Sequence, residues 1–136
     1  MKYTITPSAD GRYIILKVKE EINRQIVMQP NLEAHALGKK LGISRYLIDV
    51  TEAKNTDSIV QSYEFAYIDM LKTQGIDRNA RVAILVSPDD YSHFFIETVL
   101  NNAGLYAKIF TDPDLARLHL IKQKHTDIRS CCDFSY

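Results

Sequence analysis

The pattern of hydrophobic positions predicts that the chain starts with a β-hairpin. Residues 1–6 alternate between polar and apolar side chains, and residues 12–18 are rich in β-branched and aromatic residues. Between them lies the pair Asp10-Gly11, which is suited to a tight turn. Three more strands are expected at 45–50, 81–86 and 107–110.

Four helices are expected between and after these strands, because each carries a signal for its start. These signals are Asn31, Thr56 or Asp57, Ser87-Pro88 and Asp112-Pro113. Small polar residues cap the free amides of a first helical turn, and proline is tolerated at the first helical position. Glycines suited to helix ends follow the first three helices: Gly42, Gly75 and Gly104.

The expected second helix carries more aromatic residues than one face can bury. Its periodicity predicts a buried face of Ile59, Tyr63, Ala66, Tyr67, Met70 and Leu71. Phe65 then lies about 200° from Tyr63 around the helix axis. Either this helix is enclosed on two sides, or it exposes an aromatic residue to a partner.

Strands that alternate with helices predict an α/β fold. The continuous apolar run at 81–86 is typical of a strand buried on both faces of a parallel sheet. The expected architecture is a mixed, mainly parallel sheet of about five strands, with the N-terminal hairpin and about four helices. We expect one domain over residues 1–122, followed by a polar C-terminal tail at 123–136.

Charge and composition narrow the classes of function. The chain has 136 residues, of which 46% are hydrophobic, and its 17 basic and 17 acidic residues cancel. This balance argues against a nucleic-acid-binding domain and against attachment to an anionic membrane. No apolar segment has the length of a membrane span or of a signal peptide core. The adjacent Cys131 and Cys132 cannot staple the fold, so a cytoplasmic location is expected.

No residue set in the sequence matches a known catalytic or cofactor-binding motif. The four histidines lie on different expected elements, which argues against a metal site. Glycine-rich phosphate loops and a nucleophile elbow are absent from the sequence. Ser87 ends a strand, but the proline and aspartates that follow it are typical of a helix cap. We therefore expect a protein that is not an enzyme and needs no cofactor.

Polar residues collect where the expected strands end. They are Asp49, Thr51, Glu52, Asp57, Ser58, Ser87, Asp89, Asp90 and Asp112. An acidic rim of this kind could bind a cation or supply acid–base groups, since ligands of open parallel sheets bind at that edge. Helix capping accounts for most of these positions without a ligand. Asp49 is not explained by a cap, and we expect it to accept hydrogen bonds from the following loop.

The ordered set of elements resembles the STAS domain, the fold of bacterial anti-sigma-factor antagonists. It is most similar to the divergent SpoIIAA-like branch, which is sometimes grouped with the Sec14 lipid-binding fold. The resemblance covers about residues 10–122 and rests on four segments, which are 46–51, 81–86, 95–99 and 108–112.

The antagonists carry an Asp-Ser-Ser-Gly motif at the start of the helix after this strand, and a kinase partner phosphorylates its second serine. The matching residues here are Asp57-Ser58-Ile59-Val60. Ile59 occupies the phosphoacceptor position, so the resemblance does not carry the phosphorylation switch to this chain. Ser58 is the remaining candidate phosphoacceptor.

Three hypotheses follow. The first is a non-catalytic regulatory or protein-interaction domain that binds a protein partner through Asp49, Thr51, Asp57, Ser58 and Ile59. The second is a binder of a small apolar or lipid-like ligand, in a cavity between the sheet and the helices that carry Tyr63, Tyr67, Phe94 and Phe95. The third is an enzyme that uses Asp49 and Asp57. A homodimer is a further expectation, because the hairpin leaves an unpaired edge strand that a second copy could pair with.

Overall fold

The computed structural model describes residues 3–56 and 59–122. Five strands and four helices follow one another in this part of the chain. The strands are β1 (Tyr3–Pro7), β2 (Ile14–Val18), β3 (Arg45–Asp49), β4 (Arg81–Leu85) and β5 (Tyr106–Phe110). The helices are α1 (Arg24–Leu41), α2 (Ile59–Glu64), which continues as the π-helical segment η1 (Phe65–Met70), α3 (Phe94–Asn102) and α4 (Pro113–Ile121).

The strands form one sheet in the order β1-β2-β3-β4-β5. β1 and β2 are antiparallel, as the predicted hairpin requires, and every other neighbouring pair is parallel. This confirms the predicted mixed, mainly parallel α/β sheet. Because the order never reverses, the sheet has no switch point, the feature at which open parallel sheets usually form a ligand crevice.

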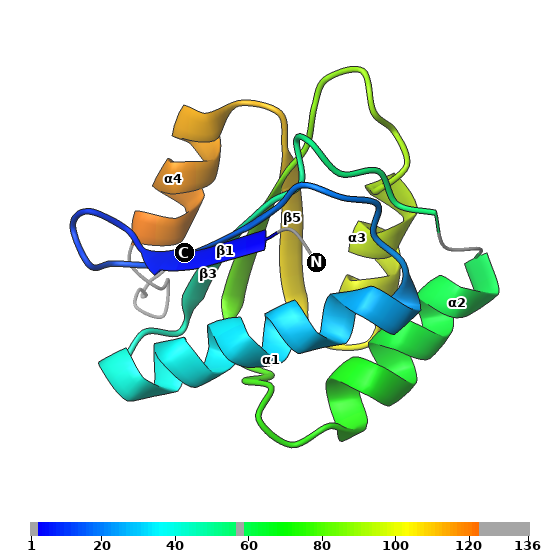
Figure 1. The fold of residues 1–136 in the computed structure, drawn as a ribbon, viewed down its shortest axis with the longest axis horizontal. Coiled ribbons are helices and arrows are strands. Elements are labelled where there is room, and N and C mark those ends of the chain that lie inside the picture. Colours follow the sequence, from blue (N-terminus) through cyan, green and yellow to red (C-terminus); the bar gives the residue numbers. More distant parts are fainter. Residues whose placement is uncertain (1–2, 57–58, 123–136) are drawn as a thin grey trace, which may run out of the picture.

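Helices cover both faces of the sheet (Figure 1). α1, η1 and α3 pack on one face, where Ile14, Leu16, Tyr46 and Ile84 point toward them. α4 covers the other face with a smaller core. That core consists of Tyr13, Ala83, Leu85, Ala116 and Leu120. Adjacent strand residues point to opposite faces, so strand position decides the layer to which each side chain belongs.

The first helix begins earlier than the sequence predicts. Asn23, not Asn31, is the N-cap, and its side chain accepts hydrogen bonds from the backbone amides of Gln25 and Ile26. Pro30 lies inside the helix, and Asn31 is buried with its side-chain amide donating to the carbonyl of Val27. The predicted cap at Asn31 is therefore wrong. A helix interior can hold a proline at a cost in stability, so Pro30 does not mark the start of this helix.

The third helix begins later than predicted. Ser87-Pro88 does not cap it, and α3 starts only at Phe94. The intervening segment folds as turns, in which Asp90 accepts a hydrogen bond from the amide of Ser92 at 2.9 Å. The capping signal failed because its aspartate satisfies a local turn instead of a helix end. At α4 the same type of signal is correct, since Asp112 caps the helix and Pro113 follows it.

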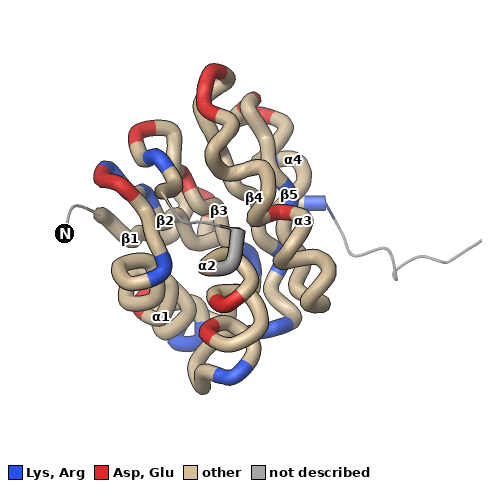
Figure 2. Tube along the Cα trace, turned by 90° about the vertical axis from the view of Figure 1, so that its right-hand side faces the viewer, with Lys and Arg blue, Asp and Glu red and all other residues tan. Residues whose placement is uncertain are grey.

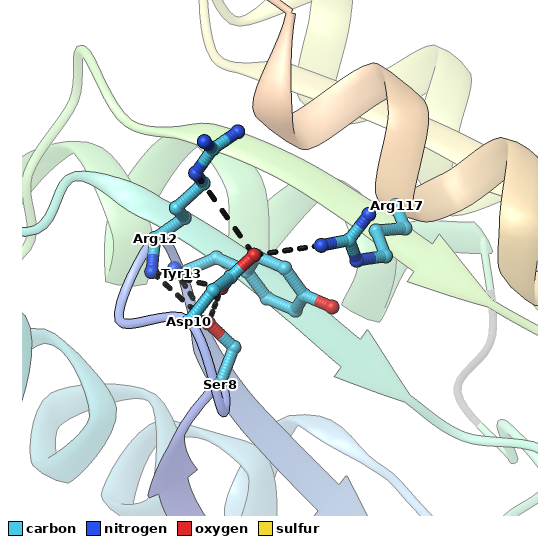
Figure 3. Close-up of polar contacts among 5 residues, drawn as sticks. All are labelled: Ser8, Asp10, Arg12, Tyr13 and Arg117. Carbon is cyan, nitrogen blue, oxygen red and sulfur yellow. Dashed lines mark hydrogen bonds and ion pairs between the residues drawn. The ribbon is translucent and has the colours of Figure 1, made fainter.

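The hairpin loop and α4 are joined by a polar cluster around Asp10 (Figure 3). The hydroxyl of Ser8 donates to Asp10 at 2.7 Å and accepts the amides of Arg12 and Tyr13. Arg117 of α4 donates to the other carboxylate oxygen of Asp10 at 2.7 Å. These contacts hold the hairpin loop against α4, beside the buried ring of Tyr13.

None of the helices in residues 3–56 and 59–122 combines the length and the apolar character that a membrane-spanning helix requires.

Candidate functional site

An exposed group of aromatic side chains lies across α2, η1 and the start of α3. Tyr63 stacks on Tyr67 with ring centroids 5.9 Å apart, and the ring of Phe95 meets Tyr63 edge to face at the same distance. These side chains are 43%, 39% and 38% exposed, respectively. We call Tyr63, Tyr67 and Phe95 the aromatic face. A second aromatic pair, Tyr91 and Phe94, is also exposed. Phe94 directly precedes Phe95 in the sequence.

The second helix is rotated relative to the prediction, so that only part of the predicted face is buried. Ala66 is buried and Met70 and Leu71 pack against the core, as predicted. Ser62, Phe65 and Ala66 are the buried residues, whereas Tyr63 and Tyr67 point outward. Residues 62, 65 and 66 form an i, i+3, i+4 stripe, and two of them are small, so they satisfy the same helical rule as the predicted set. The predicted burial of Tyr63 and Tyr67 was therefore wrong. Of the two alternatives, the helix exposes aromatic residues.

The two chain segments that carry the aromatic face are acidic in sequence. Residues 55–71 and 86–107 contain no lysine or arginine. Their acidic residues are Asp57, Glu64, Asp69, Asp89, Asp90 and Glu97. Figure 2 shows this side of the molecule, with α2 in front of the sheet and α3 beside it.

Arg24 of α1 neutralises part of this acidic charge. It donates to both carboxylate oxygens of Asp69, at 2.8 and 3.1 Å, and lies 3.0 Å from Glu64. Two parallel hydrogen bonds to one carboxylate also fix the geometry of the pair. Arg24 therefore joins the start of α1 to η1. Its single positive charge does not cancel the acidic residues of segments 55–71 and 86–107.

Asp49 forms a turn at the end of β3. One of its oxygens accepts the amide of Thr51 at 3.0 Å and the hydroxyl of Thr51 at 2.7 Å. This confirms that the following loop donates hydrogen bonds to Asp49. Its other oxygen lies 3.9 Å from Lys17 on β2, and Lys17 also contacts Glu52 at 2.9 Å. The hydrogen bond to Glu52 raises the pKa of Lys17 above its usual value.

Asp49 and α2 lie on opposite faces of the sheet. Leu47, two residues before Asp49, belongs to the core under α4, whereas Tyr46 and Ile48 pack toward the other helices. The fold therefore does not bring the side chain of Asp49 to the start of α2. Asp57 and Ser58 lie outside the described residues, and Ile59 is the first residue of α2.

A buried histidine joins the loops after β3 and β4. Nε2 of His93 lies 2.8 Å from the carbonyl oxygen of Ala53 and 3.5 Å from a carboxylate oxygen of Asp90. The hydroxyl of Ser92 accepts the amide of Asn55 at 2.9 Å. Burial opposes the charge of Asp90, but hydrogen bonds from Ser92 outweigh it and lower the pKa of that carboxyl group. The side chains of Asp90, Ser92 and His93, at the carboxyl ends of the strands, thus form hydrogen bonds with backbone groups of the two loops.

An apolar cavity of about 100 Å³ lies between the sheet and the helices α1, η1 and α3. Its walls include Val27, Ile48, Phe65, Ile84 and Leu100. A cavity was predicted between the sheet and the helices that carry Tyr63, Tyr67, Phe94 and Phe95. The cavity lies beside these helices, but none of the four side chains lines it, and all four are exposed. The volume is below the range of about 300–1,000 Å³ that is typical of sites for drug-sized ligands.

A second, more polar pocket of about 400 Å³ adjoins the cavity at the amino edge of the sheet. His35, Tyr46 and Asp77 form walls of both spaces. The ring of His35 stacks on Tyr46 with a centroid distance of 4.4 Å. Burial lowers the pKa of His35 and raises that of Tyr46 to about 12. No sequence motif marks these residues, since they are far apart in the chain and meet only through the fold.

Within the described parts of the chain, no three His, Cys, Asp or Glu side chains are grouped in a way that could hold a metal ion. Cys131 and Cys132 lie outside these parts.

Comparison with known proteins identifies the fold. No protein-family model and no curated protein matches the sequence. Among solved structures, the chain is similar to an uncharacterized protein of the DUF3478 family from Shewanella loihica PV-4, which has a SpoIIAA-like fold. The two share 19% sequence identity with a TM-score of 0.52, over 88% of this chain and 92% of the other. The chain therefore has a SpoIIAA-like fold, as its resemblance to that branch predicted.

Proposed function

We propose that this chain is a non-catalytic protein-interaction domain that binds a basic, apolar segment of a partner protein through its aromatic face. The observation that carries the proposal is the exposure of Tyr63, Tyr67 and Phe95 side by side on two helices. Contiguous exposed aromatic residues are typical of protein interfaces, where tyrosine supplies much of the binding energy.

The acidic composition of the two segments that carry the aromatic face supports a basic partner. Segments 55–71 and 86–107 supply acidic residues and no lysine or arginine. Arginine and lysine side chains also bind the faces of aromatic rings. A second copy of this chain fits less well, because a two-fold interface would bring the same acidic surface of each copy together.

The contacts at the carboxyl rim support a role without catalysis. Asp49 is held by Thr51 and Lys17, and Asp90 by Ser92 and His93. A general acid or base must reach a substrate, whereas these carboxylates already accept hydrogen bonds from their own loops, and Asp49 also lies near Lys17 of β2. A regulatory role would act through binding, with Ser58 as the candidate phosphoacceptor near the start of α2.

Binding of two matched peptides tests this proposal. The first is an amphipathic helix of about 18 residues with leucine on one face and arginine beside it, and the second has glutamate in place of arginine. We expect the wild-type protein to bind the arginine peptide, as measured by fluorescence anisotropy. Tyr67→Ala is expected to weaken this binding about tenfold, since truncation of a central tyrosine costs about 1–2 kcal/mol.

The matched control is Leu118→Ala on α4, because Leu118 is 56% exposed on the other side of the sheet. It is expected to leave the affinity for the peptide unchanged. Equal binding of the arginine and glutamate peptides would contradict the proposal. So would an equal loss of affinity in the Tyr67 and Leu118 variants, because the aromatic face would then have no special role.

The apolar cavity favours a second function, the binding of a small apolar ligand. Its walls are mostly aliphatic and aromatic, and its volume of about 100 Å³ suits a compound smaller than a typical metabolite. An apolar cavity of about 150 Å³ is known to accept benzene, so a ligand of this size class is physically reasonable. This function uses the interior and is compatible with a partner on the aromatic face.

A further inference from the structure

His35 occupies an unusual position for a titratable side chain. It lies in the middle of α1, is buried, and stacks on Tyr46 with an angle of 14° between the two rings. Its Nδ1 atom accepts a hydrogen bond from the backbone amide of Asp77, at a distance of 2.9 Å. Its ring also forms part of the wall of the apolar cavity and of the adjoining pocket.

The hydrogen bond from Asp77 fixes the tautomer of His35. A backbone amide can only donate, so Nδ1 must be the unprotonated nitrogen. Burial lowers the pKa of His35, which keeps the ring neutral near pH 7. The proton of the neutral ring therefore lies on Nε2, and within residues 3–56 and 59–122 this N–H group has no hydrogen-bond acceptor. Buried donors are usually satisfied, so this group calls for an acceptor.

The surroundings of His35 determine which acceptor fits. The residues that line the apolar cavity include no lysine or arginine, and Asp77 brings a carboxylate to the same wall. Lys39 lines only the adjoining pocket, outside the space that the apolar part of a ligand would occupy. A negatively charged ligand would be desolvated there without a compensating cation, and it would lie near a like charge. A neutral carbonyl or ether oxygen would accept the Nε2 proton without this cost.

We propose that His35 is the polar anchor of a site for a small, uncharged ligand that carries one hydrogen-bond acceptor and places its apolar part in the cavity beneath η1. Val27, Ile48, Phe65 and Ile84 would surround the apolar part. This inference rests on the second function proposed above, the binding of a small apolar ligand. It adds that the ligand is uncharged and carries one hydrogen-bond acceptor, and that His35 is the residue that binds this acceptor.

Two isosteric probes test the inference on the full chain. Cyclopentanone carries a carbonyl oxygen, and methylenecyclopentane has the same shape with a carbon in place of that oxygen. Each has about six non-hydrogen atoms, the size of benzene. We expect cyclopentanone to bind about tenfold more tightly, which is the gain from one well-formed hydrogen bond. The Nε2 proton of His35 is expected to shift in the NMR spectrum with cyclopentanone alone.

The variant His35→Phe separates the anchor from the cavity. Phenylalanine keeps a ring against Tyr46 but has no donor, so both probes are expected to bind this variant equally. Long-range nitrogen–proton spectra of the unliganded wild type provide a check that does not depend on a variant, since they report which nitrogen of His35 is protonated.

Each outcome has a distinct meaning. Equal binding of the two probes to the wild type would overturn the anchor and leave the cavity as a ligand site. Binding of neither probe would overturn both the anchor and the small-ligand function. A proton shift at His93 in place of His35 would move the polar contact to the opposite end of the cavity and would also overturn the assignment.

Discussion

Gly38 sets how closely α1 approaches β3. A β-carbon at this position would lie 2.7 Å from the carbonyl oxygen of Ile43 and closer still to the hydroxyl of Tyr46. Tyr46 is almost fully buried and donates its hydroxyl proton to the same carbonyl at 3.3 Å. A glycine inside a helix usually costs stability, so its use here is explained by the space that Tyr46 requires.

Gly38→Ala is therefore expected to destabilise the fold by about 1–3 kcal/mol, the usual cost of overpacking. Urea denaturation measures this change. Tyr46→Phe removes the hydroxyl that the new methyl group meets, so the double variant should be more stable than the sum of the two single changes predicts. Strict additivity would show that the two side chains do not compete for this space.

His119 makes stability depend on pH. Burial, together with Lys122, Arg81 and Lys108, lowers the pKa of His119 to about 4, against 6.5 for the free side chain. The unfolded chain therefore takes up a proton before the folded one does. The stabilising contribution of neutral His119 is complete above about pH 6.5 and is lost as the pH falls from there toward 4.

The size of this loss is about 1–2 kcal/mol, less than the full shift implies, because the ring is partly exposed and solvent screens the cations. His119→Phe keeps an aromatic ring against Phe110 and removes the titration. Its stability should decline less than that of the wild type between pH 6.5 and 4, as measured by urea denaturation at each pH. Parallel profiles for the two proteins would contradict the assignment.

At the residue scale, the sequence predicts local hydrogen bonding better than it predicts exposure. The turn at Asp49 and the cap at Asp112 follow from side chains that bond to amides two residues away. The exposure of Tyr63 and the burial of Ser62 differ by one position on the same helix. Aromatic residues usually fill cores, and only the packing of α2 against its neighbours shows which side is covered.

At the element scale, helix starts are decided by competition between signals. Asn23 and Asn31 are both suitable N-caps, and the chain uses the earlier one despite Pro30. Arg24, the first residue of α1, pairs with Asp69 of η1, a partner 45 positions away. Such a tertiary contact favours the earlier start, and no local pattern could reveal it.

Asn23→Ala is expected to destabilise the protein by about 1 kcal/mol, because two amides of the first helical turn lose their acceptor. Asn23→Asp keeps the acceptor and should be close to the wild type. Chemical denaturation of the three proteins compares them directly. If the alanine variant were as stable as the wild type, Asn23 would not act as the cap.

For the whole molecule, the order of elements could be predicted because buried strands and amphipathic helices alternate clearly. The predicted strands at 45–50 and 81–86 are parallel neighbours, as expected. What could not be predicted is the set of side chains that share a surface. Strand order 1-2-3-4-5 places α1, η1 and α3 on one face, so Asp49 and the start of α2 belong to opposite sides of the sheet.

The central claim is that the aromatic face, and not the carboxyl rim or α4, is the binding surface of this domain. The most direct test is to map backbone amide shifts by NMR while the arginine peptide described above is added. The account predicts that the largest shifts fall within 61–71 and 91–98. Shifts concentrated in α4 at 113–121, or the absence of any shift at a saturating peptide concentration, would contradict it.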